Sequence, residues 1–116
     1  MTAQTLTTNT QTNLDGVCNR AMGKIVTDAG TTTAQTITLG FTPRHFKITN
    51  VTALTSDEWF SGMATSGISG EALHTTTSGA AITDDTTNGI IVSGGTVTLA
   101  KSIMTASSTF YWIAEM

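Results

Sequence analysis

The fold class is decided by the stretch Gly89-Ile90-Ile91-Val92-Ser93-Gly94-Gly95-Thr96-Val97-Thr98-Leu99-Ala100. Apolar and β-branched runs flank Gly94-Gly95, and a two-residue loop of this composition is typical of a tight β-hairpin. The second run alternates threonine with apolar residues at a period of two, which is the pattern of a strand with one buried face. We therefore expect a β-hairpin here.

The same signals recur along the rest of the chain. The segment 36–39 alternates cleanly, residues 40–43 contain the turn formers glycine and proline, and residues 44–51 alternate again. No sustained helical period appears. Further strands are expected at residues 24–27, 58–63, 71–75, 89–93, 96–100 and 109–114, with residues 82–85 weakly extended. Seven to eight short strands, spaced by about ten residues, indicate an all-β fold, an antiparallel β-sandwich or barrel.

The last of these segments, Thr109-Phe110-Tyr111-Trp112-Ile113-Ala114, is the most hydrophobic in the chain. Because it is continuous rather than alternating, it predicts a central strand covered on both faces. A single domain of 116 residues has only a thin core. An exposed aromatic surface of this size is uncommon in monomers, so the segment also favours a symmetric homo-oligomer.

The N-terminal residues differ in composition from the rest. Residues 1 to about 14 are mainly threonine, glutamine and asparagine, and they bury too little apolar surface to offset their ordering entropy. We expect residues 1–20 to be a flexible polar arm and lead-in, and residues 21–116 to be the β-domain. The arm would become ordered only against a partner, including a neighbouring copy of the chain.

Composition excludes several classes of function. Five basic residues stand against eight acidic ones, for a net charge of -3, which disfavours an electrostatic nucleic-acid binder. No apolar run approaches the roughly 20 residues that span a bilayer, so no membrane partner is expected. Cys18 is the single cysteine and predicts an inert thiol rather than a disulfide. Threonine is the unusual feature, with 27 residues, and its branched Cβ suits a pleated surface.

The acidic clusters, Asp57-Glu58 and Asp84-Asp85, raise the possibility of a calcium site. Calcium prefers oxygen ligands supplied by loops, but neither run has the spacing of a calcium-binding loop. No metal ion and no cofactor is therefore predicted.

An enzyme would need a base beside a nucleophile and an orienting group. The chain has no nucleophile-elbow, paired-histidine or phosphate-loop motif, so no catalytic residue is predicted. If the protein were nonetheless an enzyme, His45 or His74 should lie in a pocket beside Asp57 or Glu58.

The aromatic residues are predicted to pack the core or to anchor a subunit interface. The alternative is a carbohydrate-binding module in which Trp59 or Trp112 stacks on a sugar. The structural or interface candidates are Phe41, Pro43, Phe46, Trp59, Phe60, Phe110, Tyr111 and Trp112.

An ordered set of motifs over about residues 24–116 resembles small virion proteins of tailed bacteriophages. The first is Leu39-Gly40-Phe41-Thr42-Pro43-Arg44-His45-Phe46-Lys47-Ile48-Thr49-Asn50, in which a Gly-aromatic-x-Pro turn leads into a strand ending in asparagine. It is followed by Glu58-Trp59-Phe60-Ser61-Gly62-Met63, Asn88-Gly89-Ile90 and Tyr111-Trp112-Ile113-Ala114-Glu115. These are structural motifs and imply no catalytic residues.

The resemblance implies a capsid decoration, or cement, protein. Such proteins look like small β-sandwiches that often sit as trimers on the shell. The expected partners are the major capsid protein and further copies of this chain, and the expected location is the capsid surface of a virion assembled in the host cytoplasm. A tail or fibre component is the alternative within the same class.

Overall fold

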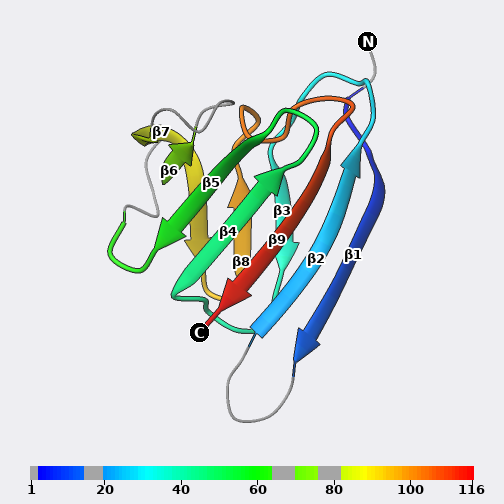
Figure 1. Cartoon of the computed structure of the whole chain (residues 1–116). Coiled ribbons are helices and arrows are strands. Elements are labelled where there is room, and N and C mark those ends of the chain that lie inside the picture. Colours follow the sequence, from blue (N-terminus) through cyan, green and yellow to red (C-terminus); the bar gives the residue numbers. More distant parts are fainter. Residues whose placement is uncertain (1–2, 15–19, 64–69, 76–81) are drawn as a thin grey trace.

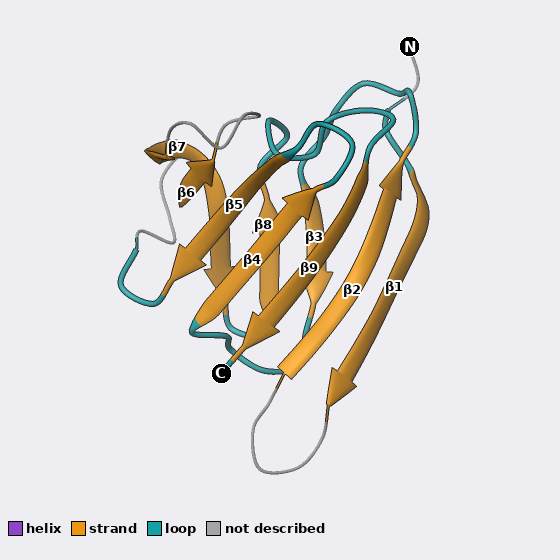
Figure 2. Ribbon diagram, in the orientation of Figure 1, coloured by secondary structure: helices purple, strands orange, loops and turns teal. Residues whose placement is uncertain are grey.

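The computed structural model describes residues 3–14, 20–63, 70–75 and 82–116. Within these segments all regular structure is β, and Figure 2 shows strands joined by loops. None of the described residues belongs to a helix long and apolar enough to cross a membrane. The strands are β1 (Leu6–Leu14), β2 (Arg20–Thr27), β3 (Gln35–Thr38), β4 (His45–Asn50), β5 (Thr55–Phe60), β6 (Glu71–Thr75), β7 (Ile82–Ser93), β8 (Thr96–Leu99) and β9 (Thr109–Glu115).

The described strands form one nine-stranded sheet in the order β1-β2-β9-β4-β5-β6-β7-β8-β3. Every neighbouring pair in this order is antiparallel. The sheet curls on itself, so that β7, β8 and β3 lie behind β5, β4 and β9 (Figure 1). The predicted all-β fold of short antiparallel strands is thus confirmed.

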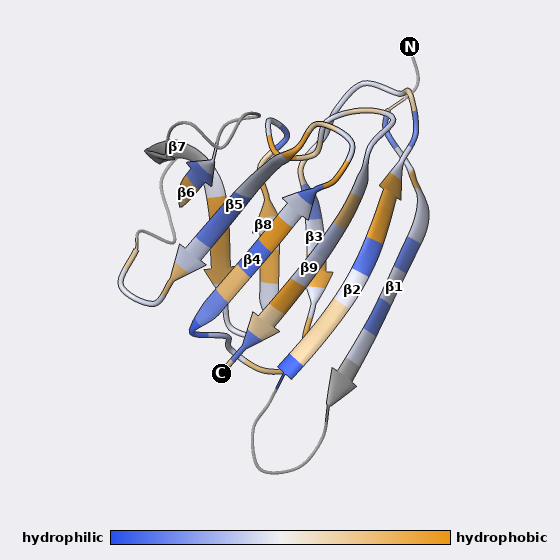
Figure 3. Ribbon diagram, in the orientation of Figure 1, coloured by the Kyte–Doolittle hydropathy of each residue, from blue (hydrophilic) through white to orange (hydrophobic). Residues whose placement is uncertain are grey.

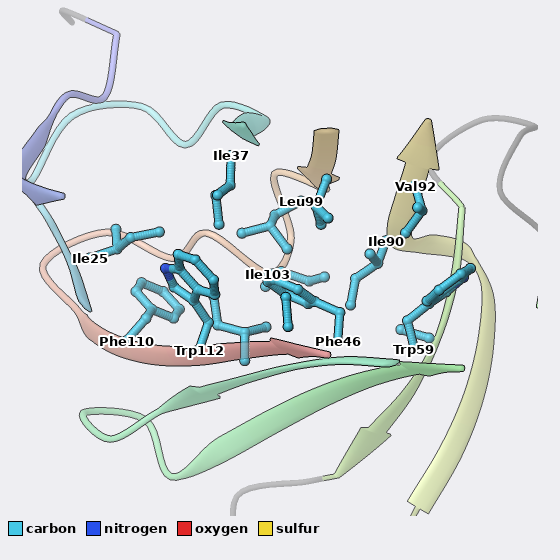
Figure 4. Close-up of a cluster of buried hydrophobic side chains, with 14 of the residues drawn as sticks. Ile25, Ile37, Phe46, Trp59, Ile90, Val92, Leu99, Ile103, Phe110 and Trp112 are labelled. Carbon is cyan, nitrogen blue, oxygen red and sulfur yellow. The ribbon is translucent and has the colours of Figure 1, made fainter. Parts of the chain in front are cut away.

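The hydrophobic core fills the space between the two sides of the curled sheet. Phe46 and Trp112 stack with ring centroids 5.7 Å apart, and they point toward Ile90 and Leu99 from the opposite side (Figure 4). Met104, from the loop between β8 and β9, is fully buried against this cluster. In β4, β8 and β9, one side of the strand therefore faces the core, and in β8 the alternation of threonine with apolar residues reflects this.

The glycine hairpin is confirmed. Ser93 pairs with Thr96, which leaves Gly94-Gly95 as the two-residue connection between β7 and β8. Gly94 has a φ of 59°, a left-handed conformation that glycine adopts without steric cost. The same turn holds the end of β3, because the Leu39 N–H donates to the Gly95 carbonyl at 2.7 Å.

The structure differs from the sequence expectation at the N-terminus, because Leu6–Leu14 is the edge strand β1 rather than a free arm. It pairs with β2 from Leu6, opposite Thr27, to Leu14, opposite Arg20. The chain itself supplies the edge against which this segment becomes ordered. Gln4 adds an anchor, since its buried side-chain amide donates to the Met104 carbonyl at 2.9 Å. A polar strand suits a sheet edge because one side of its backbone pairs with β2, while the other side and the polar side chains stay hydrated.

The expectation that the C-terminal strand is covered on both faces is wrong. β9 lies between β2 and β4, but its residues alternate: Phe110, Trp112 and Ala114 are buried, whereas Tyr111 is 48% exposed. The reason is that the other half of the curled sheet covers only one face of β9. Figure 3 shows the resulting bands of polar and apolar residues along β4 and β9.

Candidate binding face on the outside of the sheet

The candidate site is the outer face, which we define as the side of β1, β2, β9 and β4 turned away from the core. It faces the viewer in Figure 1. The register places side chains from four strands in rows across this face. Ile113 lies between Met22 and Lys47, and Lys47 pairs in turn with Glu58 of β5. In the next outward-facing row, Tyr111 lies between Lys24 and Thr49.

A groove of about 470 Å³ crosses this face. Its lining includes Thr10 and Thr12 of β1, Met22 and Lys24 of β2, and Tyr111 and Ile113 of β9. Lys47 and Thr49 of β4 form its other side. The outer face is therefore a shaped surface that combines an apolar centre with hydroxyl and ammonium groups.

The centre of the outer face exposes large side chains in the middle of a sheet. Met22 is 40% exposed and Tyr111 is 48% exposed, and both border the partly exposed Ile113. Tyrosine and methionine in such positions are typical of protein contact surfaces, because they offer apolar area together with adaptable contacts.

Two lysines flank this centre. The Lys24 ammonium lies 5.7 Å from the centroid of the Tyr111 ring, within range of a cation–π interaction. Lys47 is the cross-strand neighbour of Glu58, but the Glu58 carboxylate is bound to His45 instead. Within the described segments, no carboxylate forms an ion pair with either lysine. The groove is therefore locally basic although the protein is acidic overall.

A charged cluster closes one end of the face. His45 Nε2 lies 2.6 Å from a Glu58 oxygen, and Nδ1 lies 3.1 Å from a Glu115 oxygen. Arg20 donates to the second Glu115 oxygen at 2.9 Å. The His45 ring thus bridges two carboxylates that come from the strands on either side of β4, Glu58 from β5 and Glu115 from β9. The hydrogen bond from His45, followed by that from Arg20, holds the pKa of Glu115 below its ordinary value.

The predicted aromatic candidates divide between the core and the outer face. Phe60 is 41% exposed and stacks on His45 with centroids 5.1 Å apart, while Tyr111 lies in the groove. Trp59 and Trp112 are each only 3% exposed, which removes them as a sugar-stacking platform. The other candidates lie in or against the core: Phe41, Pro43, Phe46 and Phe110.

Both histidines lie beside the carboxylates that the enzyme alternative specifies. His74 Nδ1 is 2.9 Å from Asp57, and His45 contacts Glu58. The two pairs are on opposite faces of the sheet, because consecutive strand residues alternate in direction and Asp57 is buried. Within the described part of the chain, neither ring is hydrogen-bonded to a hydroxyl or thiol. The described residues thus show two separate histidine–carboxylate contacts, His45 with Glu58 and His74 with Asp57.

The same alternation separates the acidic pair considered for calcium. Asp57 points inward and Glu58 outward, so their carboxylates do not converge on one cation. Among the described residues, no group of three potential ligands could hold a metal ion. The side chains of Asp84 and Asp85 lie outside the described set.

Four residues of the groove were not predicted from the sequence as members of a site: Met22, Lys24, Lys47 and Ile113. The signal available was the alternation of Met22 and Lys24 with Ala21, Gly23 and Ile25, which marks residues 21–25 as a strand with an outward side. Comparison adds no further candidates, since no protein-family model, no curated protein and no solved structure matches this chain. The outer face therefore provides the structural argument for function.

Proposed function

We propose that this protein is a non-enzymatic structural component of a tailed-bacteriophage virion. Its role is that of a decoration protein, which binds the outside of the assembled head and bridges neighbouring capsomers. The partners in this proposal are the major capsid protein and other copies of the chain, in a trimer. The motif order described above supports the class of protein, and the outer face supports the mode of action.

The observation that carries the proposal is the exposed apolar centre of the outer face. Met22, Tyr111 and Ile113 stand on adjacent strands whose opposite sides are packed into the core. Hydrogen bonding on both sides of β9 makes this surface rigid, so binding orders few additional groups. A protein that acts by shape complementarity needs such a surface. A decoration protein that binds only the expanded lattice stabilises that lattice by mass action.

The test is co-sedimentation of the purified protein with empty expanded heads, unexpanded heads and tails of the phage that encodes it. We expect saturable binding to expanded heads at a fixed stoichiometry. Binding to tails alone would contradict the head location and identify a tail or fibre component. A protein that joins none of these particles would overturn the virion assignment.

A matched pair of variants connects this test to the outer face. Tyr111→Thr removes the exposed ring and keeps a residue that favours strands, so we expect head affinity to fall by at least about ten-fold. Val51→Thr is the control, because Val51 is 45% exposed in the turn after β4, away from the groove. Equal loss of binding in both variants would show that the outer face is not the contact surface.

A further inference from the structure

The positions of the groove lysines carry a more specific inference. Lys24 on β2 is opposite Tyr111, whereas Lys47 on β4 is opposite Ile113, two residues further along the intervening strand β9. Two strand spacings and a two-residue offset place their Cα atoms roughly 12 Å apart. The middle of this diagonal lies over Tyr111 and Ile113. The groove thus has the pattern basic, apolar, basic.

This pattern is complementary to an extended acidic segment. In an extended chain, residues i, i+2 and i+4 point to the same side, and i to i+4 spans about 13 Å. Carboxylates at i and i+4 would meet Lys24 and Lys47, while an apolar side chain at i+2 would rest on Ile113. The hydroxyls of Thr10, Thr12 and Thr49 line the groove and offer hydrogen bonds to the backbone of such a segment.

A second copy of the chain packed face to face fits this surface less well. Such a contact would bring four ammonium groups together around the apolar centre. The nearest carboxylates on the face, Glu58 and Glu115, are already bound to His45 and Arg20. Uncompensated like charges in a desolvated contact are unfavourable. Charge complementarity therefore selects an acidic partner.

We propose that the groove between Lys24 and Lys47 binds an extended acidic polypeptide segment with carboxylates at i and i+4 and an apolar residue at i+2. That the segment belongs to the capsid shell rests on the proposed function. The binding chemistry itself does not, and it is tested without phage particles.

The probe is the capped peptide Ser-Glu-Ser-Leu-Ser-Glu-Ser, titrated into the full ¹⁵N-labelled chain at low salt and followed by NMR. One control peptide replaces both glutamates with glutamine. A second control, Ser-Ser-Leu-Glu-Glu-Ser-Ser, has the same composition but adjacent carboxylates. We expect the probe to bind at least about five-fold more tightly than either control. The chemical-shift changes that the probe causes in the protein should be centred on Lys24, Lys47, Tyr111 and Ile113.

Charge variants locate the site. Lys24→Gln and Lys47→Gln should each weaken binding of the probe about two- to five-fold, as expected for solvent-accessible ion pairs. Lys101→Gln removes one positive charge from an exposed position outside the groove and should leave binding unchanged. Equal weakening by Lys101→Gln, or equal binding of the glutamine peptide, would overturn the proposal.

Further experiments distinguish the acidic segment from a second copy of the chain, and distinguish a failure of this proposal from a failure of the proposed function. A concentration-dependent dimer that becomes more stable in the Lys24→Gln, Lys47→Gln double variant would overturn the acidic-segment proposal in favour of a second copy. If the wild-type protein binds phage heads but does not bind the probe peptide, the acidic-segment proposal is overturned and the proposed function is not. If the protein binds the probe peptide but does not bind any phage particle, the acidic-segment proposal for the groove is supported and the proposal of a virion protein is contradicted.

Discussion

At the scale of single residues, Gly23 makes the most demanding contact of the outer sheet. It pairs with Trp112 in the register, and a Cβ at Gly23 would lie 2.6 Å from the indole ring. The same atom would be 2.1 Å from the Thr10 carbonyl oxygen. A glycine here lets the large ring lie across the backbone of β2, which is a known way of packing aromatic residues in sheets.

We therefore expect Gly23→Ala to lower the free energy of unfolding by about 2–4 kcal/mol. The new methyl group would clash with the Trp112 ring, which is fixed in the core, and with the Thr10 carbonyl, which is fixed by the pairing of β1 with β2. Urea denaturation would measure this change. Gly95→Ala is the control, since the nearest atoms to its Cβ would be 3.5 Å away and its φ is not positive. A destabilisation equal to that of Gly95→Ala would contradict the packing described for Trp112.

Glu115 gives the protein a predictable response to acid. Its pKa is lowered from an ordinary value of 4.5, first by the hydrogen bond from His45. The unfolded chain therefore takes up this proton at a higher pH than the folded chain does. The stabilisation from Glu115 is present above about pH 4.5 and is lost as the pH falls through the lowered pKa.

The measurement is the urea midpoint of the wild type and of Glu115→Gln at several values between pH 7 and pH 3. We expect Glu115→Gln to be the less stable protein at pH 7 and the difference to shrink at low pH. Asp28 also has a lowered pKa, through its hydrogen bond with Thr5, but it is common to both proteins and cancels. A difference that stays constant with pH would show that the His45–Glu115–Arg20 contacts do not stabilise the fold.

At the scale of elements, β1 gives the clearest test of the fold. Eight residue pairs join it to β2, and the carboxylate of Asp28 accepts hydrogen bonds from the Thr5 N–H and hydroxyl at its start. Deleting residues 1–14 exposes the edge of β2. We expect this to lower the free energy of unfolding by more than about 2 kcal/mol, because each backbone bond contributes about 0.5–1.5 kcal/mol.

A second variant keeps the β1 backbone and its pairing with β2 but changes the side chains of β1, so it shows how much the side chains alone contribute to stability. Thr8→Ala with Thr12→Ala changes outward side chains of β1 and should alter stability by less than about 1 kcal/mol. Circular dichroism with urea would follow both proteins. A deletion variant as stable as the wild type would show that residues 1–14 act as a detachable arm, as their composition suggests.

Elements with strong local signals are those that the sequence predicts well. The alternation at residues 96–99 and the Gly94-Gly95 turn are local properties, and the structure confirms both. β1 was missed because its order comes from pairing with β2 and not from burial of its own side chains. In β9, a continuous apolar run indicated two covered faces, although hydrogen bonding to two neighbours does not require a second covering layer.

The candidate site was harder to predict because it depends on register. Lys24 and Lys47 are far apart in the sequence, and only the pairing of β2 and β4 with β9 places them on either side of Tyr111 and Ile113. The aromatic content of residues 110–112 did indicate an interface, and Tyr111 is on the exposed face. The charges around it have no sequence motif, since any outward strand position can hold a lysine.

At the scale of the whole molecule, the curled sheet uses one face for folding stability and the other face for the proposed binding. One side of β2, β9 and β4 forms the core, while the other carries the groove. Substitutions of the outward groove residues Lys24, Lys47 and Tyr111 should therefore change binding with little effect on folding. Two contributions to binding are expected from this rigid surface, one from the apolar centre and one from the two lysines. Salt should distinguish them, because it screens the charges of the lysines and leaves the apolar contact.

We expect head binding to weaken a few-fold when NaCl is raised from about 0.1 M to 1 M, because the screening length falls from about 10 Å to 3 Å. The apolar contact persists, so binding should not vanish. The Lys24→Gln, Lys47→Gln double variant should bind more weakly at low salt and should show little further loss. Co-sedimentation titrations at both salt concentrations measure this directly. If the double variant keeps the full salt dependence of the wild type, the charges that meet the shell lie elsewhere on the molecule, and the groove contributes only its apolar centre.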